Sequence, residues 1–153
     1  MGRDREPSFR LCGAGEDFLE IVVGHPTQSD TDYYSDANWI SAGIRVEVGA
    51  FKGHVAASLR REDFPVLRDG LKKLYVDLTG QAKFTTMEEW IELEITGDGR
   101  GHFTGRGFLI DNLWGKNRLL FEIQFDQTEL PRLIGELDNI VAQRPILGSP
   151  GVV

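Results

Sequence analysis

Carboxylates gather in one polar stretch of this chain, and their spacing is the first feature that could support chemistry. Asp30, Asp32 and Asp36 lie close together between His25 and Asn38. Alternating carboxylates in a loop can point inward at one hard cation, as in calcium loops. The stretch lacks the glycine at the bend and the closing bidentate glutamate of such a loop. We therefore predict no metal ion here.

Aromatic side chains interleave with these carboxylates. Tyr33 and Tyr34 stand between Asp32 and Asp36, and Trp39 follows. An acidic, aromatic-rich loop is typical of a surface that anchors a protein partner with rings and steers it with charge. Burial in the core is the favoured prediction for Trp39, whereas the two tyrosines remain candidates for partner contact. An acidic run is also typical of plain solvated surface.

A second group of carboxylates lies in the run from Trp90 to Thr96. Aliphatic residues alternate there with Glu92 and Glu94, so both carboxylates point to the other face of a strand. They would be about 7 Å apart, but an acid and base pair needs an apolar cage, and both are expected to be solvated. We predict a second negative patch. The predicted partner-binding residues are Asp30, Asp32, Tyr33, Tyr34, Asp36, Glu92 and Glu94.

Histidine and cysteine are few and scattered. His25, His54 and His102 lie in separate segments, and none has the spacing of a zinc helix. Cys12 is the single cysteine, so no intrachain disulfide forms, and its place beside Leu11 favours a small buried hydrophobe. No nucleophile-elbow pattern accompanies the serines. The sequence predicts no catalytic residue, no cofactor and no metal site.

The glycine-rich stretch Gly97–Gly101 has two interpretations. A phosphate-binding loop needs its glycines to open a helix whose N-terminus receives the phosphate. Here a β-patterned run follows, and Asp98-Gly99 between two such runs is a strong hairpin signal. We predict a hairpin.

The elements that would position these side chains follow from the hydrophobic pattern. The segment 63–71 returns as 129–137, each after two β-patterned runs, which indicates a strand-strand-helix unit used twice. The predicted class is α+β: an antiparallel sheet of about seven or eight strands with two helices packed on one face. The strands are expected over 8–12, 17–23, 40–48, 51–59, 82–86, 90–96, 102–110 and 119–125, with a long polar loop over 25–38.

Proline, glycine and threonine mark the predicted helix ends. Pro65 falls in the first turn of the first helix and Gly80 ends it. Thr128 is the predicted N-cap of the second helix, and Pro145 stops it. The inner stripes are predicted to be Phe64, Leu67, Leu71, Leu74, Tyr75 and Leu78 in the first helix, and Leu130, Leu133, Ile134, Leu137, Ile140 and Val141 in the second.

Size and charge narrow the class of protein. At 153 residues, one domain over 1–153 can bury about 70% of its unfolded surface, with flexible ends expected at 1–7 and 148–153. The net charge is −7, and no lysine or arginine stands between Leu11 and Ile44. This balance argues against a nucleic-acid partner and favours a basic protein. With no apolar run of membrane-spanning length and no export segment, a cytoplasmic location is expected.

Several short segments form a set when they are taken in their order and spacing: 36–40 (DANWI), 49–53 (GAFKG), 63–64 (DF) with 74–75 (LY), 80–84 (GQAKF), 97–102 (GDGRGH) and 125–130 (FDQTEL). Together they resemble the WapI family of immunity proteins, small bacterial proteins associated with WapA-type secreted toxins. The resemblance extends from Asp36 to about Pro145. It implies a cytoplasmic antidote that binds a kin toxin domain, often a basic nuclease, and blocks it. The family offers no established functional residues to carry over.

The sequence thus predicts a non-enzymatic immunity protein that neutralises a cognate, basic, nuclease-type toxin through an acidic surface. One alternative is a small-ligand-binding domain or enzyme that uses a concave sheet face roofed by Trp39, Trp90 or Trp114. Another is a structural subunit that self-associates through a sheet edge. The oligomeric state is left open.

Overall fold

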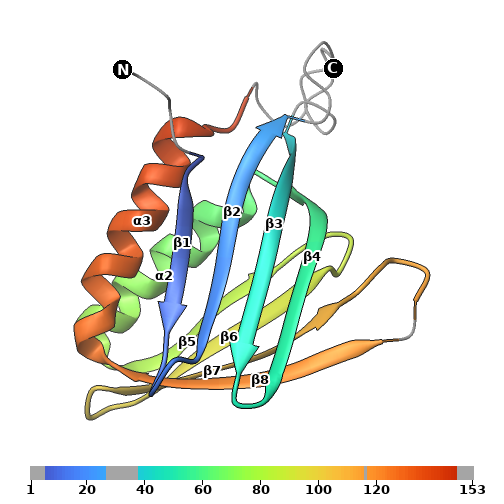
Figure 1. The fold of residues 1–153 in the computed structure, drawn as a ribbon. Helices are drawn as coiled ribbons and strands as arrows, with labels where there is room; N and C mark the ends of the chain where they lie inside the picture. The colour runs from blue at the N-terminus through green and yellow to red at the C-terminus, as the bar shows by residue number, and fades with distance from the viewer. Residues whose placement is uncertain (1–5, 27–37, 116, 148–153) are drawn as a thin grey trace, which may run out of the picture.

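The computed structural model describes residues 6–26, 38–115 and 117–147. Within them the chain forms eight strands and two helices (Figure 1). The elements in chain order are β1 (Ser8–Cys12), β2 (Phe18–Pro26), β3 (Trp39–Val48), β4 (Phe51–Arg60), α2 (Asp63–Asp77), β5 (Thr79–Thr85), β6 (Ile91–Asp98), β7 (His102–Ile110), β8 (Arg118–Asp126), a 3-10 turn η1 (Gln127–Glu129) and α3 (Leu130–Gln143).

The strands form two four-stranded antiparallel sheets, so the prediction of a single sheet was wrong. The first sheet has the order β1-β2-β3-β4 and the second the order β5-β6-β7-β8. Helix α2 leads the chain away from β4 before β5 begins, and β5 therefore starts a new ladder with β6. Each sheet has one apolar face, and the two sheets and two helices cover one another.

The prediction that both helices pack on one face of a single sheet was wrong, because the strands form two sheets. Helix α3 runs along β1, helix α2 runs along β5, and the helices pack against each other (Figure 1). The predicted strand-strand-helix units correspond to β3-β4-α2 and β7-β8-α3, and two further strands precede each of them. That an internal sequence duplication produced this order stays a prediction, because the same order of elements also arises without a duplication.

Buried side chains from both sheets and both helices form one core. Phe84 on β5 is its meeting point: its ring centroid lies 6.2 Å from that of Phe9 on β1 and 5.4 Å from that of Phe64 on α2. All three rings are almost completely buried. Each contributes about 1.5–3 kcal/mol by leaving water. The core therefore fixes the second sheet against the first through α2.

Helix α2 follows its predicted pattern at the start and departs from it at the end. Pro65 lies in its first turn, as predicted. Its last helical residue is Asp77, and Leu78 takes the left-handed conformation (φ 63°) while its N–H donates to Leu74 O at 2.8 Å. Gly80 is already in β5, so the predicted glycine stop was wrong. Tyr75, predicted on the inner stripe, is 47% exposed.

Helix α3 is entered through η1, a turn that the sequence pattern does not predict. The N-cap of η1 is Asp126, whose carboxylate accepts the N–H of Thr128 at 2.9 Å, whereas α3 itself begins after Glu129 without a side-chain cap. Thr128, the predicted N-cap, instead lies inside η1 and donates its hydroxyl to the same carboxylate. The carboxylate is the stronger acceptor, and it comes first in the chain. Helix α3 ends at Gln143, close to the predicted stop at Pro145.

The described residues cover only part of the segments predicted to be flexible. Most of 1–7, all of 148–153 and most of the polar loop 25–38 lie outside them. Within the first segment, the carbonyl of Pro7 accepts a hydrogen bond from Val23 N at 2.8 Å. Neither described helix has the length and apolar character needed to cross a membrane.

Candidate partner-binding surface

Glu92 and Glu94 lie on the face of the second sheet that points away from the core, as their alternation predicted. Ile91, Leu93 and Ile95 between and beside them are buried on the opposite face, each at most 1% exposed. We call this outward side the outer face of the second sheet. The other predicted partner-binding residues, Asp30, Asp32, Tyr33, Tyr34 and Asp36, lie outside the described residues.

Strand register arranges the outer face into rows that cross β5, β6, β7 and β8. Each row takes one residue from each strand, because paired residues in antiparallel strands stand opposite one another. The row nearest the β7–β8 hairpin is Thr85, Glu92, Phe108 and Leu120; the middle row is Lys83, Glu94, Arg106 and Glu122; the third row is Gln81, Thr96, Thr104 and Gln124.

The middle row alternates in charge. Lys83 Nζ lies 3.6 Å from a Glu94 oxygen, and Arg106 Nε lies 2.6 Å from a Glu122 oxygen. The Arg106 guanidinium holds the pKa of the Glu122 carboxyl below its ordinary value. These side chains are all substantially exposed, so the pairs add little to stability. They form an ordered charged surface that a partner can meet.

The row nearest the hairpin carries exposed apolar area. Leu120 is 72% exposed, and the half-buried ring of Phe108 stands beside it. The Arg118 guanidinium lies 4.1 Å above the Phe108 ring, a distance typical of cation–π contact. Exposed aliphatic, aromatic and arginine side chains together are typical of protein interfaces.

Trp114, in the loop between β7 and β8, is 93% exposed. Its backbone is held in place by the loop: Asn112 Oδ1 accepts Trp114 N at 3.0 Å, and Gly115 N donates to Asn112 O at 3.2 Å. Asp111 Oδ2 accepts Asn117 Nδ2 across the loop at 2.8 Å. These bonds hold the described part of the loop in place in the free protein, which lowers the entropic cost of binding.

The other end of the outer face is a tight polar turn, and the hairpin predicted for Gly97–Gly101 is confirmed. Asp98 Oδ1 accepts the backbone N–H groups of Arg100 at 2.7 Å and His102 at 3.1 Å. These bonds, that to Arg100 above all, hold the pKa of Asp98 below its ordinary value. Gly99 and Gly101 take positive φ, which this turn requires.

His102 and Asp98 form a pair beside an open hollow of about 250 Å³. His102 Nδ1 lies 3.3 Å from Asp98 Oδ2, and both side chains are exposed. Acid–base catalysis normally relies on burial to tune such groups, and an exposed pair at a turn lacks that tuning. The pair is best explained as part of the turn.

In the described part of the chain, the side chains on the inner sides of the two sheets form one core. Trp114 stands at a hairpin tip and roofs no cavity, while Trp39 and Trp90 are half-buried, so the predicted burial of Trp39 is only partial. Cys12 is half-buried on β1. Across the described ranges, no group of three or more histidine, cysteine, aspartate or glutamate side chains is placed to hold a metal ion.

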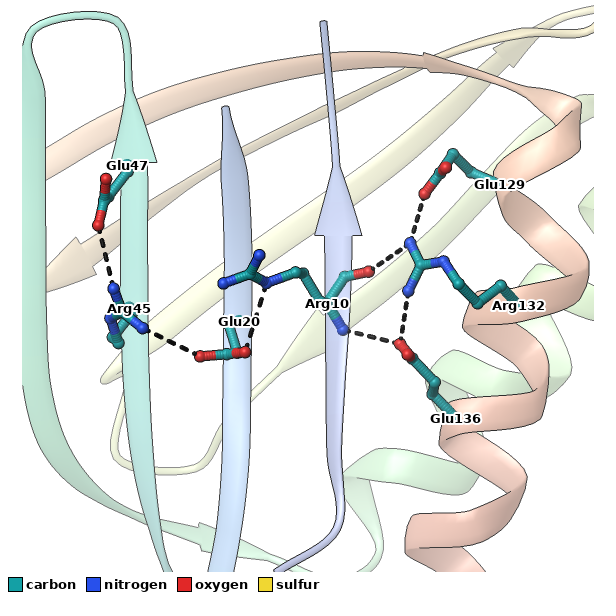
Figure 2. Close-up of polar contacts among 7 residues, drawn as sticks. All are labelled: Arg10, Glu20, Arg45, Glu47, Glu129, Arg132 and Glu136. Atoms are coloured by element: carbon teal, nitrogen blue, oxygen red, sulfur yellow. Dashed lines mark hydrogen bonds and ion pairs between the residues drawn. The ribbon is translucent and has the colours of Figure 1, made fainter. Parts of the chain in front are cut away.

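The outer side of the first sheet differs because its charges bind one another. Figure 2 shows Glu20 on β2 between two arginines: Arg10 Nε lies 3.3 Å from it and Arg45 Nη1 lies 3.4 Å from it. Arg45 also reaches Glu47 at 3.1 Å. Both guanidiniums lie over the ring of Phe18, at 4.0 and 5.3 Å from its centroid. This network links β1, β2 and β3 through charges that are paired with one another.

A family model for immunity proteins of the WapI-like family matches residues 10–145. The chain belongs to that family. The resemblance inferred from Asp36 to Pro145 is therefore confirmed, and the match also includes β2 and the end of β1. Membership implies that this WapI-like protein neutralises a toxin and that its partner is the cognate toxin.

Two other comparisons of the WapI-like protein concern curated sequences and solved structures. No curated protein matches its sequence. A solved structure of MRP1/MRP2 from Trypanosoma brucei is similar in fold, with a TM-score of 0.52 and 11% sequence identity, over 90% of this chain and 85% of that one. At this identity the similarity concerns the fold alone.

The apolar part of the surface of this WapI-like protein was not among the predicted partner-binding residues. Phe108 and Leu120 both fall on the outward phase of their alternating strands, and this signal was present in the sequence. Trp114 was treated as a possible roof over a pocket. An aromatic residue on the polar phase of a strand, next to a loop tryptophan, is the pattern that would have identified the surface.

Proposed function

We propose that this protein neutralises its toxin by direct, non-enzymatic binding in the cytoplasm, and that the outer face of the second sheet and the Trp114 loop form the contact surface. The observation that carries the proposal is the 93% exposure of Trp114 on a hydrogen-bonded loop. A tryptophan side chain with this high exposed fraction, beside Phe108 and Leu120, is typical of an anchor that enters a partner's pocket.

Charge supports a basic toxin, of the nuclease type that the family resemblance implies. Carboxylates outnumber cations on the outer face: Glu92, Glu94, Asp98, Glu122 and Asp126 stand against Lys83, Arg106 and Arg118. An acidic surface can occupy the phosphate-binding surface of a nuclease and speed association with it. The acidic stretch with Asp30, Asp32 and Asp36, flanked by Tyr33 and Tyr34, is proposed to extend this surface.

The direct test pairs the protein with its cognate toxin domain. Co-expression should restore growth of cells that produce the toxin domain, and the two purified proteins should form a complex measurable by calorimetry. Continued killing in the presence of soluble, folded protein would remove the proposed function. A catalytic turnover of the toxin by sub-stoichiometric protein would contradict non-enzymatic binding.

The contribution of the acidic stretch has its own test. Asp30, Asp32 and Asp36 changed together to Lys should slow association with the toxin domain by about tenfold or more and weaken its salt dependence. The control reverses three carboxylates placed elsewhere, Glu16, Asp69 and Asp77, and should slow association less. Equal association rates for the two variants would remove the stretch from the contact surface.

A further inference from the structure

Each sheet has two edge strands, and in the described residues α3, α2 and the β1–β2 turn lie beside three of the four edges. Arg132 and Glu136 of α3 bind the backbone of Arg10 on β1 (Figure 2). Strand β5 runs beside α2. The β1–β2 turn meets β8, since a Cβ at Gly13 would lie 2.5 Å from Ile123 Cγ2. Strand β4 is the fourth edge.

The backbone of β4 presents a regular set of outward hydrogen-bonding groups. A two-residue turn joins β3 to β4, so its flanking pair, Val48 and Phe51, is hydrogen-bonded, and every second residue after Phe51 faces away from β3. Arg60 follows this rule, because its N–H donates to Asp63 Oδ2 and not to β3. In the described part of the chain no partner binds the outward N–H groups of Lys52, His54, Ala56 and Ser58.

A groove runs beside this edge. Its volume is about 310 Å³, with β4 as one wall and the base of the β7–β8 hairpin as the other. The hairpin extends past the free side of β4 (Figure 1). The groove therefore combines unpaired strand edge with apolar lining. Its lining includes Lys52, His54, Val55, Leu109, Arg118 and Leu119.

Cations dominate this groove although the whole chain has a net charge of −7. Lys52 is 77% exposed, and its one ion-pair partner, Glu47, is 4.0 Å away. Arg118 stands on the opposite wall. The groove's aspartate, Asp111, already accepts hydrogen bonds from Asn112 and Asn117. Strand β4 itself contains no aspartate or glutamate.

We propose that β4 receives an extended, carboxylate-bearing segment of the toxin as an additional strand that begins in this groove and continues along β4 past Ala56. The inference rests on the proposed function, since it names a second contact with the same partner. Backbone pairing supplies affinity, and the cations on both walls select an acidic segment. With an acidic outer face on one side and a basic groove on the other, the two signs of charge fix the toxin's orientation.

A second copy of this chain is a poorer occupant of the same edge. Two β4 strands paired about Ala56 would set Lys52 of each copy opposite Arg60 of the other. Like charges directly opposite each other destabilise a strand pair. A segment with carboxylates has no such penalty.

Amide hydrogen exchange tests the strand pairing directly. We expect the outward amides of Lys52, His54, Ala56 and Ser58 to exchange about tenfold or more slowly in the complex with the toxin domain. The amides of Val55 and Ala57, which face β3, provide the internal control because they are already hydrogen-bonded in the free protein. Formation of the complex with unchanged exchange at the outward amides would overturn the inference.

Two variants provide a second measurement. Ala56→Pro removes one outward N–H, a change that an edge strand tolerates, and it should weaken toxin binding about tenfold or more, whereas Ala56→Val keeps the N–H and should not. Lys52→Glu should weaken binding similarly, with Lys73→Glu on the exposed side of α2 as its control. Variants that bind the toxin domain as tightly as their controls would contradict binding of the toxin segment at β4 and the groove.

These outcomes separate the inference from the proposed function. If the protein does not bind the toxin domain at all, the proposed function fails, and the inference fails with it. If the protein binds and neutralises the toxin while β4 amides and β4 variants behave as in the free protein, only the inference fails. Light scattering on the free protein gives a further check. If the natural protein is a dimer and the Ala56→Pro variant is a monomer, the β4 edge binds a second copy of the chain and the inference is wrong.

Discussion

The guanidinium of Arg132 on α3 donates a hydrogen bond to the backbone oxygen of Arg10 on β1 at 2.8 Å (Figure 2). Glu136, one turn further along α3, accepts the N–H of Arg10 at 2.9 Å. The two side chains thus satisfy both backbone groups of an edge residue, and Arg132 also binds Glu129 and Glu136. Helix side chains here replace a fifth strand, and they protect this edge from pairing with another chain.

Arg132→Met should lower the free energy of unfolding by about 1 kcal/mol. The hydrogen bond to Arg10 is lost, and the partial exposure of the guanidinium limits the cost. Urea denaturation measures the change. Arg100→Met, in the exposed β6–β7 turn, is the control and should have little effect. Equal stability of the two variants would mean that α3 does not hold the β1 edge.

The contribution of Asp63 to the stability of the protein should fall as pH rises from about 4 to about 6. Burial raises the pKa of this carboxyl from 3.8 to about 6, although Arg60 N–H donates to it. The unfolded chain therefore releases the proton at lower pH than the folded chain, and the contribution is unfavourable above the folded pKa. It amounts to about 2–3 kcal/mol at pH 7 relative to pH 4.

Asp63→Asn removes this titration and tests the prediction. Relative to the natural protein, the variant should gain stability between pH 4 and pH 7, measured by urea denaturation at several pH values. Asp69→Asn changes an exposed carboxylate of the same helix and is the matched control. Parallel pH profiles for Asp63→Asn and the natural protein would show that Asp63 does not titrate in this range.

Gly107 on β7 should be the glycine least tolerant of substitution. A Cβ at this position would lie 1.8 Å from the backbone oxygen of Glu92, so the strands would have to separate. Gly107→Ala should cost about 2 kcal/mol or more of stability. Gly43→Ala is the control, because its nearest neighbour would be His54 Nε2 at 3.9 Å, and it should leave the melting temperature unchanged or slightly raised. Similar melting temperatures would contradict the close packing of β6 and β7.

Trp114→Ala should weaken toxin binding and leave the stability of the protein nearly unchanged. The side chain is 93% exposed, so the melting temperature should change little. Loss of an interface anchor typically costs about 2 kcal/mol, so toxin affinity should fall about 30-fold in calorimetry. Tyr75→Ala, a partly exposed aromatic on α2, is the control for binding. If Trp114→Ala binds the toxin with unaltered affinity, the contact surface does not include the tip of the β7–β8 hairpin.

Local patterns accounted for the strands and turns. A period of two places Ile91, Leu93 and Ile95 inward and Glu92 and Glu94 outward, because successive side chains of a strand point to opposite faces. Short turns with glycine fix hairpins, as at Gly49 and Gly99, because the turn limits which residues can pair. These are interactions between residues near in sequence, so the sequence determines them directly.

The division into two sheets depended on tertiary structure. Alternation says that one side of a strand is buried, but it does not say whether another sheet or a helix covers it. Strands β4 and β5 were assigned to one sheet, and the core around Phe84 instead places β5 under α2. The entry to α3 also depended on local competition: the carboxylate of Asp126, and not the predicted Thr128, caps the turn η1 that precedes the helix.

The sequence by itself determined the α+β class, the outward placement of Glu92 and Glu94 and, through its segments, the immunity family. Only the tertiary structure set Lys83 and Arg106 beside those carboxylates, exposed Trp114 and, among the described residues, left the outward N–H groups of β4 unpaired next to a basic groove. The physical reason is that charge and exposure at a surface depend on which strands become neighbours. That pairing is settled by burial of the whole core and not by any one segment.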